Sequence, residues 1–368
     1  MKMPSPNILP AFVALSACML VSSPSYSQEF PLRAMNEGTI DEETVYEASD
    51  FAILDDSGLI WQETIEKLGA KHMRLHFAEF ANPDGESFEM IIRAGSQQRI
   101  RYTEGTLPGE NFWSPMLRGN TALIQVTAEV APRTMQFKID KVAYQSPGGS
   151  WESIIDDPDF EEINAYKSND DITRVGNAIA KLTFFDNGYD SCTGFMISPN
   201  RLMTNHHCVS TLEICETTMA IFGFQKNENG DEVYGNQYAC ENVVTVDYEL
   251  DFAVLEFQDN PGDKYGFLPF INADVTSDQS VYIIQHADGK PKQIVINNCD
   301  VLDAVIDGRG PTSDFSHTCD TLGGSSGSPV MTVNHQVIGL HHFGIDQETY
   351  WDRNRAIRIP LILAKLAE

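Results

Sequence analysis

Three segments in the C-terminal half of the chain carry residue types that can cleave an acyl bond. The first ends in a pair of histidines followed by a cysteine, the second begins with an aspartate and the third holds serines between glycines (residues 192–208, 251–255 and 323–330). A serine hydroxyl is a weak nucleophile at neutral pH and needs an adjacent base, which an imidazole can supply because it titrates near neutrality. A buried carboxylate can then fix the histidine tautomer and stabilise the imidazolium. The three segments predict nucleophilic acyl transfer.

In the order His, Asp, Ser, these segments resemble the chymotrypsin-like (trypsin-fold) serine peptidases, most closely their bacterial glutamyl-endopeptidase-like branch. The resemblance spans about residues 175–368. It implies a secreted serine endopeptidase that acts on protein or peptide substrates through an acyl-enzyme. The fold that it implies is a double β-barrel, and it implies neither a cofactor nor a metal ion.

One residue is favoured in each segment. The family places the base immediately before a cysteine, which selects His207 rather than His206. Asp251 is preferred to other nearby aspartates because only Asp251 opens an apolar run that can bury it beside the histidine. The frame Gly-x-Ser-Gly-x-Pro selects Ser326 over the two serines next to it. We therefore expect a triad of His207, Asp251 and Ser326.

The glycines around Ser326 allow backbone N–H groups to approach a developing oxyanion. The resemblance implies that the N–H groups of Gly324 and Ser326 form this oxyanion hole, in which each donor contributes roughly 3–4 kcal/mol. Ser325 stands where animal-type trypsins carry the aspartate that receives a new N-terminus during zymogen activation. We expect no activation by that switch.

The resemblance also implies a pocket for the side chain that precedes the scissile bond. His341 and Thr321 match the histidine and the hydroxyl that receive a substrate carboxylate in glutamyl endopeptidases, and His342 lies beside them in the sequence. Charge-assisted hydrogen bonds would hold such a carboxylate. Asp320 instead matches the carboxylate with which trypsins capture Lys or Arg. We expect cleavage after Glu or Asp, with cleavage after Lys or Arg as the alternative.

The cysteines indicate an oxidising compartment. Of seven, Cys18 lies near the N-terminus, and the other six predict three disulfides, with buried free thiols as the alternative. The peptidase frame implies two pairs that brace the histidine and nucleophile segments. The third pair is left by elimination among about 15 connectivities, which gives Cys192–Cys208, Cys299–Cys319 and Cys215–Cys240.

The N-terminus and the net charge agree with export. Residues 1–27 have a positive charge, an apolar stretch and small residues before Gln28, which predicts a secretory signal peptide. The alternative is a lipoprotein anchored through Cys18. No later segment is long and apolar enough to predict a membrane span. The net charge of −28 makes nucleic acid an unfavourable partner, and the sequence predicts no oligomeric state.

Three further regions follow the signal peptide. Alternating apolar and polar residues between turn signals predict a β-sandwich accessory domain at 28–150. Dense carboxylates at 151–174 predict an acidic linker, with a solvated face of the next domain as the alternative. The peptidase domain is expected at 175–368, ending in a short helix. The predicted fold class is therefore all-β, a sandwich followed by a double barrel.

Two other classes of function fit the same residues. A catalytically silent relative could use the peptidase fold as a binding module. A metallohydrolase could use the histidine pairs 206–207 and 341–342, but adjacent residues of a strand point to opposite faces, which makes each pair a poor chelate.

Overall fold

The computed structural model describes residues 34–43, 45–95, 97–145, 152–154, 157–186, 188–344 and 353–368. The predicted signal peptide and lipid-anchor cysteine lie outside these residues. The described residues belong to one compact unit, Leu32–Glu368, and their regular structure is mostly strand, with few helical residues. The predicted all-β class, with a sandwich, a double barrel and a short C-terminal helix, is confirmed. Within the described part of the chain, no helix has the length and hydropathy needed to cross a bilayer.

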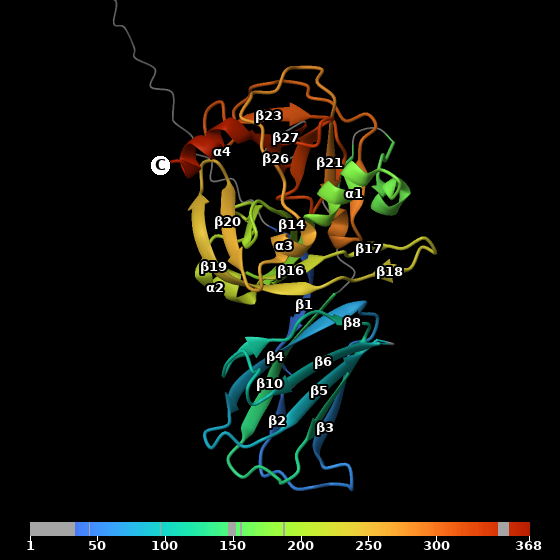
Figure 1. Ribbon diagram of the computed structural model, residues 1–368, viewed down its shortest axis with the longest axis vertical. Coiled ribbons are helices and arrows are strands. Elements are labelled where there is room, and N and C mark those ends of the chain that lie inside the picture. Colours follow the sequence, from blue (N-terminus) through green and yellow to red (C-terminus); the bar gives the residue numbers. More distant parts are fainter. Residues whose placement is uncertain are drawn as a thin grey trace, which may run out of the picture. The chain divides into compact units, whose positions relative to one another are not determined.

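The N-terminal region is a β-sandwich (Figure 1). One sheet has the order β3-β9-β5-β6, formed by Leu59–Glu66, Thr121–Thr127, Glu89–Ala94 and Gln98–Thr103. The second layer is built on Met35–Asp41 (β1), Tyr46–Ala48 (β2), His72–Ala81 (β4), Phe112–Trp113 (β7), Leu117–Arg118 (β8) and Gln136–Gln145 (β10). Inward-facing residues alternate along β9, and Trp61 meets Phe137 edge to face across the layers, with ring centroids 5.1 Å apart.

The first half of the peptidase-like region is a closed barrel of six strands. The order is β13-β16-β19-β20-β15-β14, and β13 pairs with β14 to close it. The strands are Ile179–Phe185 (β13), Tyr189–Met196 (β14), Arg201–Thr204 (β15), Met219–Phe222 (β16), Gln237–Asp247 (β19) and Phe252–Phe257 (β20). Two short helices lie between strands, Leu212–Thr217 (α2) and Pro261–Tyr265 (α3), with the hairpin Gln225–Lys226 (β17) and Glu232–Val233 (β18).

The second half is a seven-stranded sheet followed by the terminal helix Ile359–Leu366 (α4). Its order is β12-β22-β21-β25-β26-β27-β23, formed by Glu161–Glu162, Gln293–Val295, Val281–Gln285, Pro329–Thr332, Val337–Phe343, Asn354–Arg358 and Asp314–His317. Thr321–Leu322 (β24) pairs with Glu152–Ser153 (β11), and Ala287–Gly289 (η2) is a short 3₁₀ turn. One apolar core includes residues of both halves, among them Leu202, Tyr282 and Leu340.

The described part of the predicted acidic linker packs on this region. Glu161 and Glu162 pair with β22, and they are followed by Ile163–Tyr166 (η1) and the helix Asp170–Asn177 (α1). Ile163 and Ile172 are buried in the shared core. These two isoleucines anchor the segment, while its described carboxylates between residues 157 and 171 are partly or fully exposed.

Strand β1 belongs to both regions. It pairs with β10 of the sandwich and with β14 of the barrel, where Met35 lies opposite Ser191. Glu37 of β1 is buried between Lys181 of the barrel and His72 of the sandwich. The N-terminal strand is therefore part of the structure that surrounds the predicted site.

Candidate active site

Adjacent strands bring His207 and Asp251 together. β15 ends at Thr204, three residues before His207, and it pairs with β20, which begins directly after Asp251. The Asn205 side chain donates to the Asp251 carbonyl at 2.9 Å. The turn that follows β15 is thus fixed to the start of β20, and both predicted residues lie at the same end of the barrel.

The carboxylate of Asp251 holds His207 in two ways. Oδ1 accepts the backbone N–H of His207 at 3.0 Å, and Oδ2 lies 2.8 Å from ring Nδ1. Asp251 is fully buried. Burial by itself would raise the pKa of Asp251, but the charges and hydrogen bonds of His207 and then His342 overcome it and hold this pKa well below its usual range. The carboxylate therefore stays ionised, and Nε2 is the ring nitrogen of His207 left for proton transfer.

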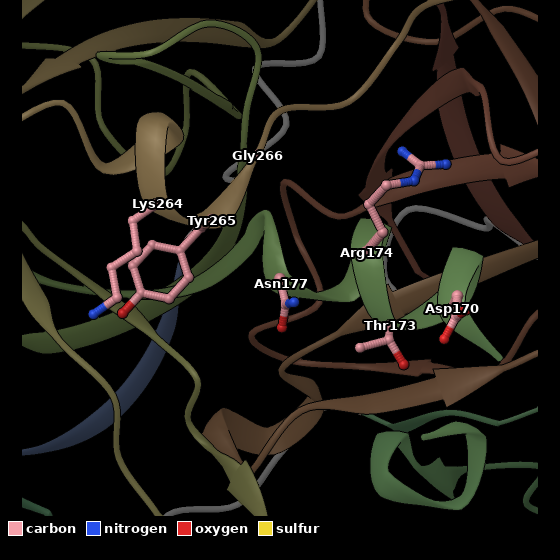
Figure 2. Close-up of a pocket in the computed structure, with 7 residues that line it drawn as sticks. All are labelled: Asp170, Thr173, Arg174, Asn177, Lys264, Tyr265 and Gly266. Carbon is pink, nitrogen blue, oxygen red and sulfur yellow. The ribbon is translucent and has the colours of Figure 1, made fainter. Parts of the chain in front are cut away.

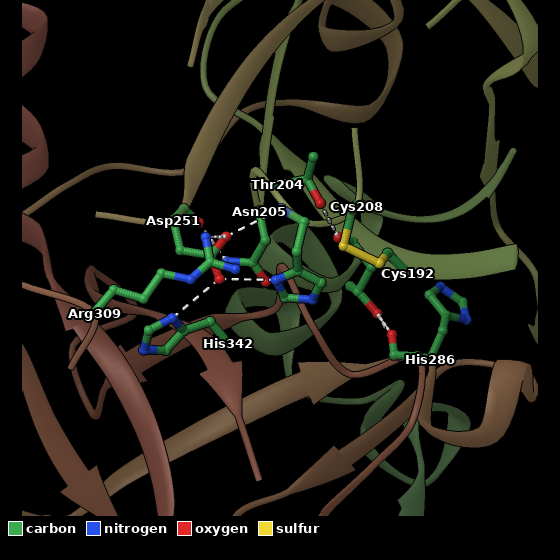
Figure 3. Close-up of a disulfide and its surroundings, with 11 residues drawn as sticks. Cys192, Thr204, Asn205, Cys208, Asp251, His286, Arg309 and His342 are labelled. Carbon is green, nitrogen blue, oxygen red and sulfur yellow. Dashed lines mark hydrogen bonds and ion pairs between the residues drawn. A yellow bond between two sulfur atoms is a disulfide. The ribbon is translucent and has the colours of Figure 1, made fainter. Parts of the chain in front are cut away.

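Two residues that the sequence did not assign to this carboxylate also contact it. Figure 3 shows Arg309 and His342 on the Asp251 side chain. Arg309 Nη1 donates to Oδ1 at 3.0 Å, and His342 Nδ1 lies 3.1 Å from Oδ2. His342, predicted at the substrate pocket, has its other nitrogen 2.7 Å from Asp314 Oδ2. Both of its ring nitrogens are therefore engaged by carboxylates.

The turn between β24 and β25 carries the three serines, and only Ser326 is partly exposed. Ser325 and Ser328 are fully buried, and Ser325 Oγ accepts the Leu322 N–H at 3.1 Å. The Ser326 carbonyl accepts the Thr193 N–H at 2.8 Å. Gly327 has φ +86°, and a side chain there would collide with the Thr193 carbonyl. The glycine allows this close approach of the turn to β14.

A disulfide joins this turn to the histidine. Thr193, whose N–H binds the Ser326 carbonyl, directly follows Cys192. The two sulfurs of the Cys192–Cys208 disulfide and a ring nitrogen of His207 all lie within 4.8 Å of one another. Cys192, His207 and Cys208 are the one group of three or more potential metal ligands among the described residues. The two sulfurs are bonded to each other, however, so neither is a free thiolate. The Cys192–Cys208 disulfide thus lies next to both the residue that binds the Ser326 backbone and the ring of His207.

A hydrogen bond from another segment holds the turn that carries the predicted oxyanion donors. The Gly323 carbonyl accepts the Asp288 N–H at 2.6 Å. Because carbonyl and N–H of one trans peptide point in opposite directions, the Gly324 N–H points away from Asp288. Gly324 has φ +88°, which a side chain would strain. A Cβ on Gly323 would come within 3.1 Å of Met35 Cγ, so the first residue of β1 covers this glycine.

The other predicted pocket residues are buried and already bonded. Thr321 Oγ1 donates to Asn354 Oδ1 at 2.9 Å, and Asp320 Oδ2 accepts the Asp159 N–H at 2.8 Å. His341 Nδ1 lies 3.2 Å from His317 Nε2. Burial lowers the pKa of His317 to about 3 and lowers that of His341 well below its ordinary value. Both rings are therefore neutral.

The partners Asn354 and His317 escaped the sequence analysis. They come from β27, which pairs with β26, and from β23, which pairs with the far edge of β27, and only the fold brings them to Thr321 and His341. Neither residue lies in a sequence motif that would have identified it as part of the site. The three disulfides have the predicted pairing, with Cα–Cα distances of 6.3, 5.3 and 4.2 Å for Cys192–Cys208, Cys215–Cys240 and Cys299–Cys319.

A hollow of about 360 Å³ is lined by none of these residues. Figure 2 shows its lining side chains, which come from α1 and from the end of α3: Asp170, Thr173, Arg174, Asn177, Lys264, Tyr265 and Gly266. None of them is a predicted site residue. It has no nucleophile–base pair, so we place no chemistry there.

Comparison with known proteins agrees with this geometry. Residues 192–340 match the family described as trypsin-like peptidase domain. Glutamyl endopeptidase of Staphylococcus epidermidis is 24% identical over 169 residues, which cover 44% of this chain and 57% of that protein. Secreted RxLR effector protein 73 of Plasmopara viticola is 25% identical over 304 residues, 75% of each chain. The predicted resemblance to trypsin-fold serine peptidases of the glutamyl-endopeptidase type is thereby confirmed.

A solved structure of a Glu endopeptidase overlaps 58% of this chain and 98% of its own, at 22% identity and a TM-score of 0.42. The chain spans little more than half of the length of the staphylococcal endopeptidase.

Proposed function

We propose that this protein is an exported serine endopeptidase in which Ser326 is the nucleophile, His207 the base and Asp251 the residue that orients the base. The observation that carries the proposal is the fully buried Asp251 carboxylate bonded to both the backbone and the ring of His207. A buried, ionised carboxylate on Nδ1 leaves Nε2 of His207 unprotonated, as a general base requires.

The proposed reaction uses these atoms in two steps. Nε2 of His207 takes the proton of Ser326 Oγ as this oxygen attacks the scissile carbonyl, and it then gives the proton to the leaving amine. Water, deprotonated by the same nitrogen, hydrolyses the acyl-enzyme and regenerates Ser326. The N–H groups of Gly324 and Ser326 would bind the oxyanion. The orientation of the Gly323 carbonyl toward Asp288 supports this role for Gly324.

We propose a preference for Glu or Asp before the scissile bond, received by His341 and Thr321. Asp320, Thr321 and His341 are all buried and hydrogen-bonded, and the similarity to the glutamyl endopeptidase of Staphylococcus epidermidis favours this choice over cleavage after Lys or Arg. Matched chromogenic peptides that differ only at that residue test the choice. Preferential cleavage after Arg that is lost in Asp320→Ala and kept in His341→Ala would overturn it.

Export rests on the disulfides and on the relatives. Three disulfides persist in an oxidising compartment, and one relative is named as secreted. We propose cleavage after residue 27, with anchoring through Cys18 as the alternative. The sandwich at 28–150 and the peptidase domain from 175 are the proposed domains.

The nucleophile is tested by three alanine variants of the full chain. We expect Ser326→Ala to reduce kcat on the order of 10⁶-fold while circular dichroism stays unchanged. Ser325→Ala and Ser328→Ala are the matched controls, and both should keep the activity. Activity retained in Ser326→Ala and lost in either control would refute the assignment. A folded wild-type chain that cleaves no member of a peptide library would instead indicate a binding module.

A further inference from the structure

His342 occupies an unusual position beside the proposed triad. It is on β26 and is fully buried, with Nδ1 3.1 Å from Asp251 Oδ2 and Nε2 2.7 Å from Asp314 Oδ2. Ser313 Oγ donates to the other oxygen of Asp314 at 2.7 Å. A single imidazole thus bridges the proposed triad carboxylate and a second buried carboxylate on β23.

The hydrogen-bond pattern favours a doubly protonated His342. Ionised carboxylates only accept hydrogen bonds, so with Asp251 and Asp314 both ionised the imidazole between them donates from both nitrogens and carries a positive charge. Burial by itself would lower the pKa of His342, but Asp314 and Asp251 overcome it and raise this pKa. The geometry and the direction of the shift agree.

A second cation completes the surroundings of Asp251. Arg309 donates to Oδ1, and its guanidinium lies over the Tyr248 ring at 4.5 Å from the centroid. Among the described residues, the titratable and charged groups around His342 are two carboxylates, one guanidinium and three imidazoles, contributed by Asp251, Asp314, Arg309, His207, His317 and His341. With His317 and His341 neutral, the two buried carboxylates are balanced by His342 and Arg309 before His207 gains any proton.

Competition for one oxygen links His342 to His207. Both Nδ1 atoms bond Asp251 Oδ2, at 2.8 Å from His207 and 3.1 Å from His342, so the two nitrogens are no more than about 6 Å apart. A positive charge at this distance disfavours protonation of His207. It also fixes the rotation of the carboxylate, since each oxygen already has two donors.

We infer that His342 is a cationic positioning residue, which locks the Asp251 carboxylate through Asp314 and places a positive charge beside His207. The inference rests on the proposed function for its kinetic consequence. The expected consequence is an acid limb of kcat/KM shifted to lower pH, because this limb reports protonation of the base in the free enzyme.

Two variants remove the charge in different ways. His342→Gln keeps a neutral donor next to Asp251, and Asp314→Asn removes one of the two anions that keep His342 charged. We expect His342→Gln to move the acid-limb midpoint of kcat/KM upward by about one pH unit, because the variant removes the positive charge beside the base. It should also lower kcat about tenfold with KM changed less than twofold. Asp314→Asn should move the midpoint in the same direction. A folded His342→Gln variant with an unmoved midpoint would overturn the inference.

Nuclear magnetic resonance of the wild-type full chain, labelled with ¹⁵N at histidine, provides a test independent of folding and of activity. Two protonated ring nitrogens on His342 at pH 7 support the inference, and one unprotonated nitrogen overturns it. The His207 titration in wild type and His342→Gln reads the coupling even if no substrate is cleaved. A failure of the proposed function, seen as no peptide cleavage, can therefore be distinguished from a failure of this inference, seen in the histidine spectrum.

Discussion

Replacing Glu37 by Gln should destabilise the protein far more than its position on an N-terminal strand suggests. The Glu37 side chain is 1% exposed, and its Oε1 contacts Lys181 Nζ and, at 2.8 Å, His72 Nε2. Lys181 is itself fully buried and also donates to the Gly289 carbonyl at 2.8 Å. Glu37→Gln leaves the buried ammonium without its counter-charge, which costs more than the lost attraction between the two.

The magnitude follows from the ionisation of Glu37. Burial by itself would raise its pKa, but Lys181 and then His72 overcome it and lower the pKa from 4.5 to about 2. This difference corresponds to about 3 kcal/mol, within the range of about 3–5 kcal/mol for breaking a buried pair. Because the folded-state pKa is the lower one, the stabilisation is complete above pH 4.5 and is lost as the pH falls toward 2.

Thermal unfolding measured from pH 2 to 7 tests this. Glu79→Gln is the matched control, because Glu79 makes an exposed ion pair with Lys138 at 2.9 Å, and such pairs contribute at most about 1 kcal/mol. We expect Glu37→Gln to lower Tm clearly more than Glu79→Gln at pH 7, with the two converging near pH 2. Equal effects at pH 7, or a difference that persists at pH 2, would refute the reasoning.

Three further predictions concern the surroundings of the site. Met35→Ala should lower kcat several-fold with little change in KM, because Met35 covers Gly323 beside the proposed oxyanion donors; unchanged steady-state kinetics would contradict this support. Replacing Cys192 and Cys208 by Ala should lower the free energy of unfolding by about 3 kcal/mol in denaturant titrations; an unchanged midpoint would count against the bridge. Lys292 is fully buried, and burial lowers its pKa from 10.5 to about 7, so Lys292→Met should be more stable than wild type at pH 6. This advantage should shrink as the pH rises from 7 toward 10.5, because the wild-type ammonium is then lost in both the folded and the unfolded state. A difference in Tm between the two proteins that does not change with pH would contradict this prediction.

The sequence predicts those parts of the site that follow from a local pattern of apolar and polar residues. Asp251 could be chosen because it opens an apolar strand, and that strand does pair beside the one that leads to His207. Alternation along β26 also held, since His341 contacts His317 and His342 contacts Asp251, on different sides of the strand.

The rest depends on long-range packing that no spacing encodes. Arg309 and Asp314 come from a loop and a strand whose approach to Asp251 is decided by the second sheet. Glu37 lies 144 residues from Lys181, and nothing in either segment identifies its partner. In the acidic segment, the burial of Ile163 and Ile172 in the shared core likewise depends on packing that the run of carboxylates does not indicate.

The central claim is that Ser326 is the nucleophile, and covalent labelling tests it most directly. An organophosphonate with an acidic side chain should inactivate the full chain, add one label per molecule and, after digestion and mass spectrometry, be found on Ser326. His207→Ala should label at a greatly reduced rate, since the hydroxyl would lack its base. Stoichiometric label on Ser325 or Ser328, or full inactivation with Ser326 unmodified, would contradict the claim.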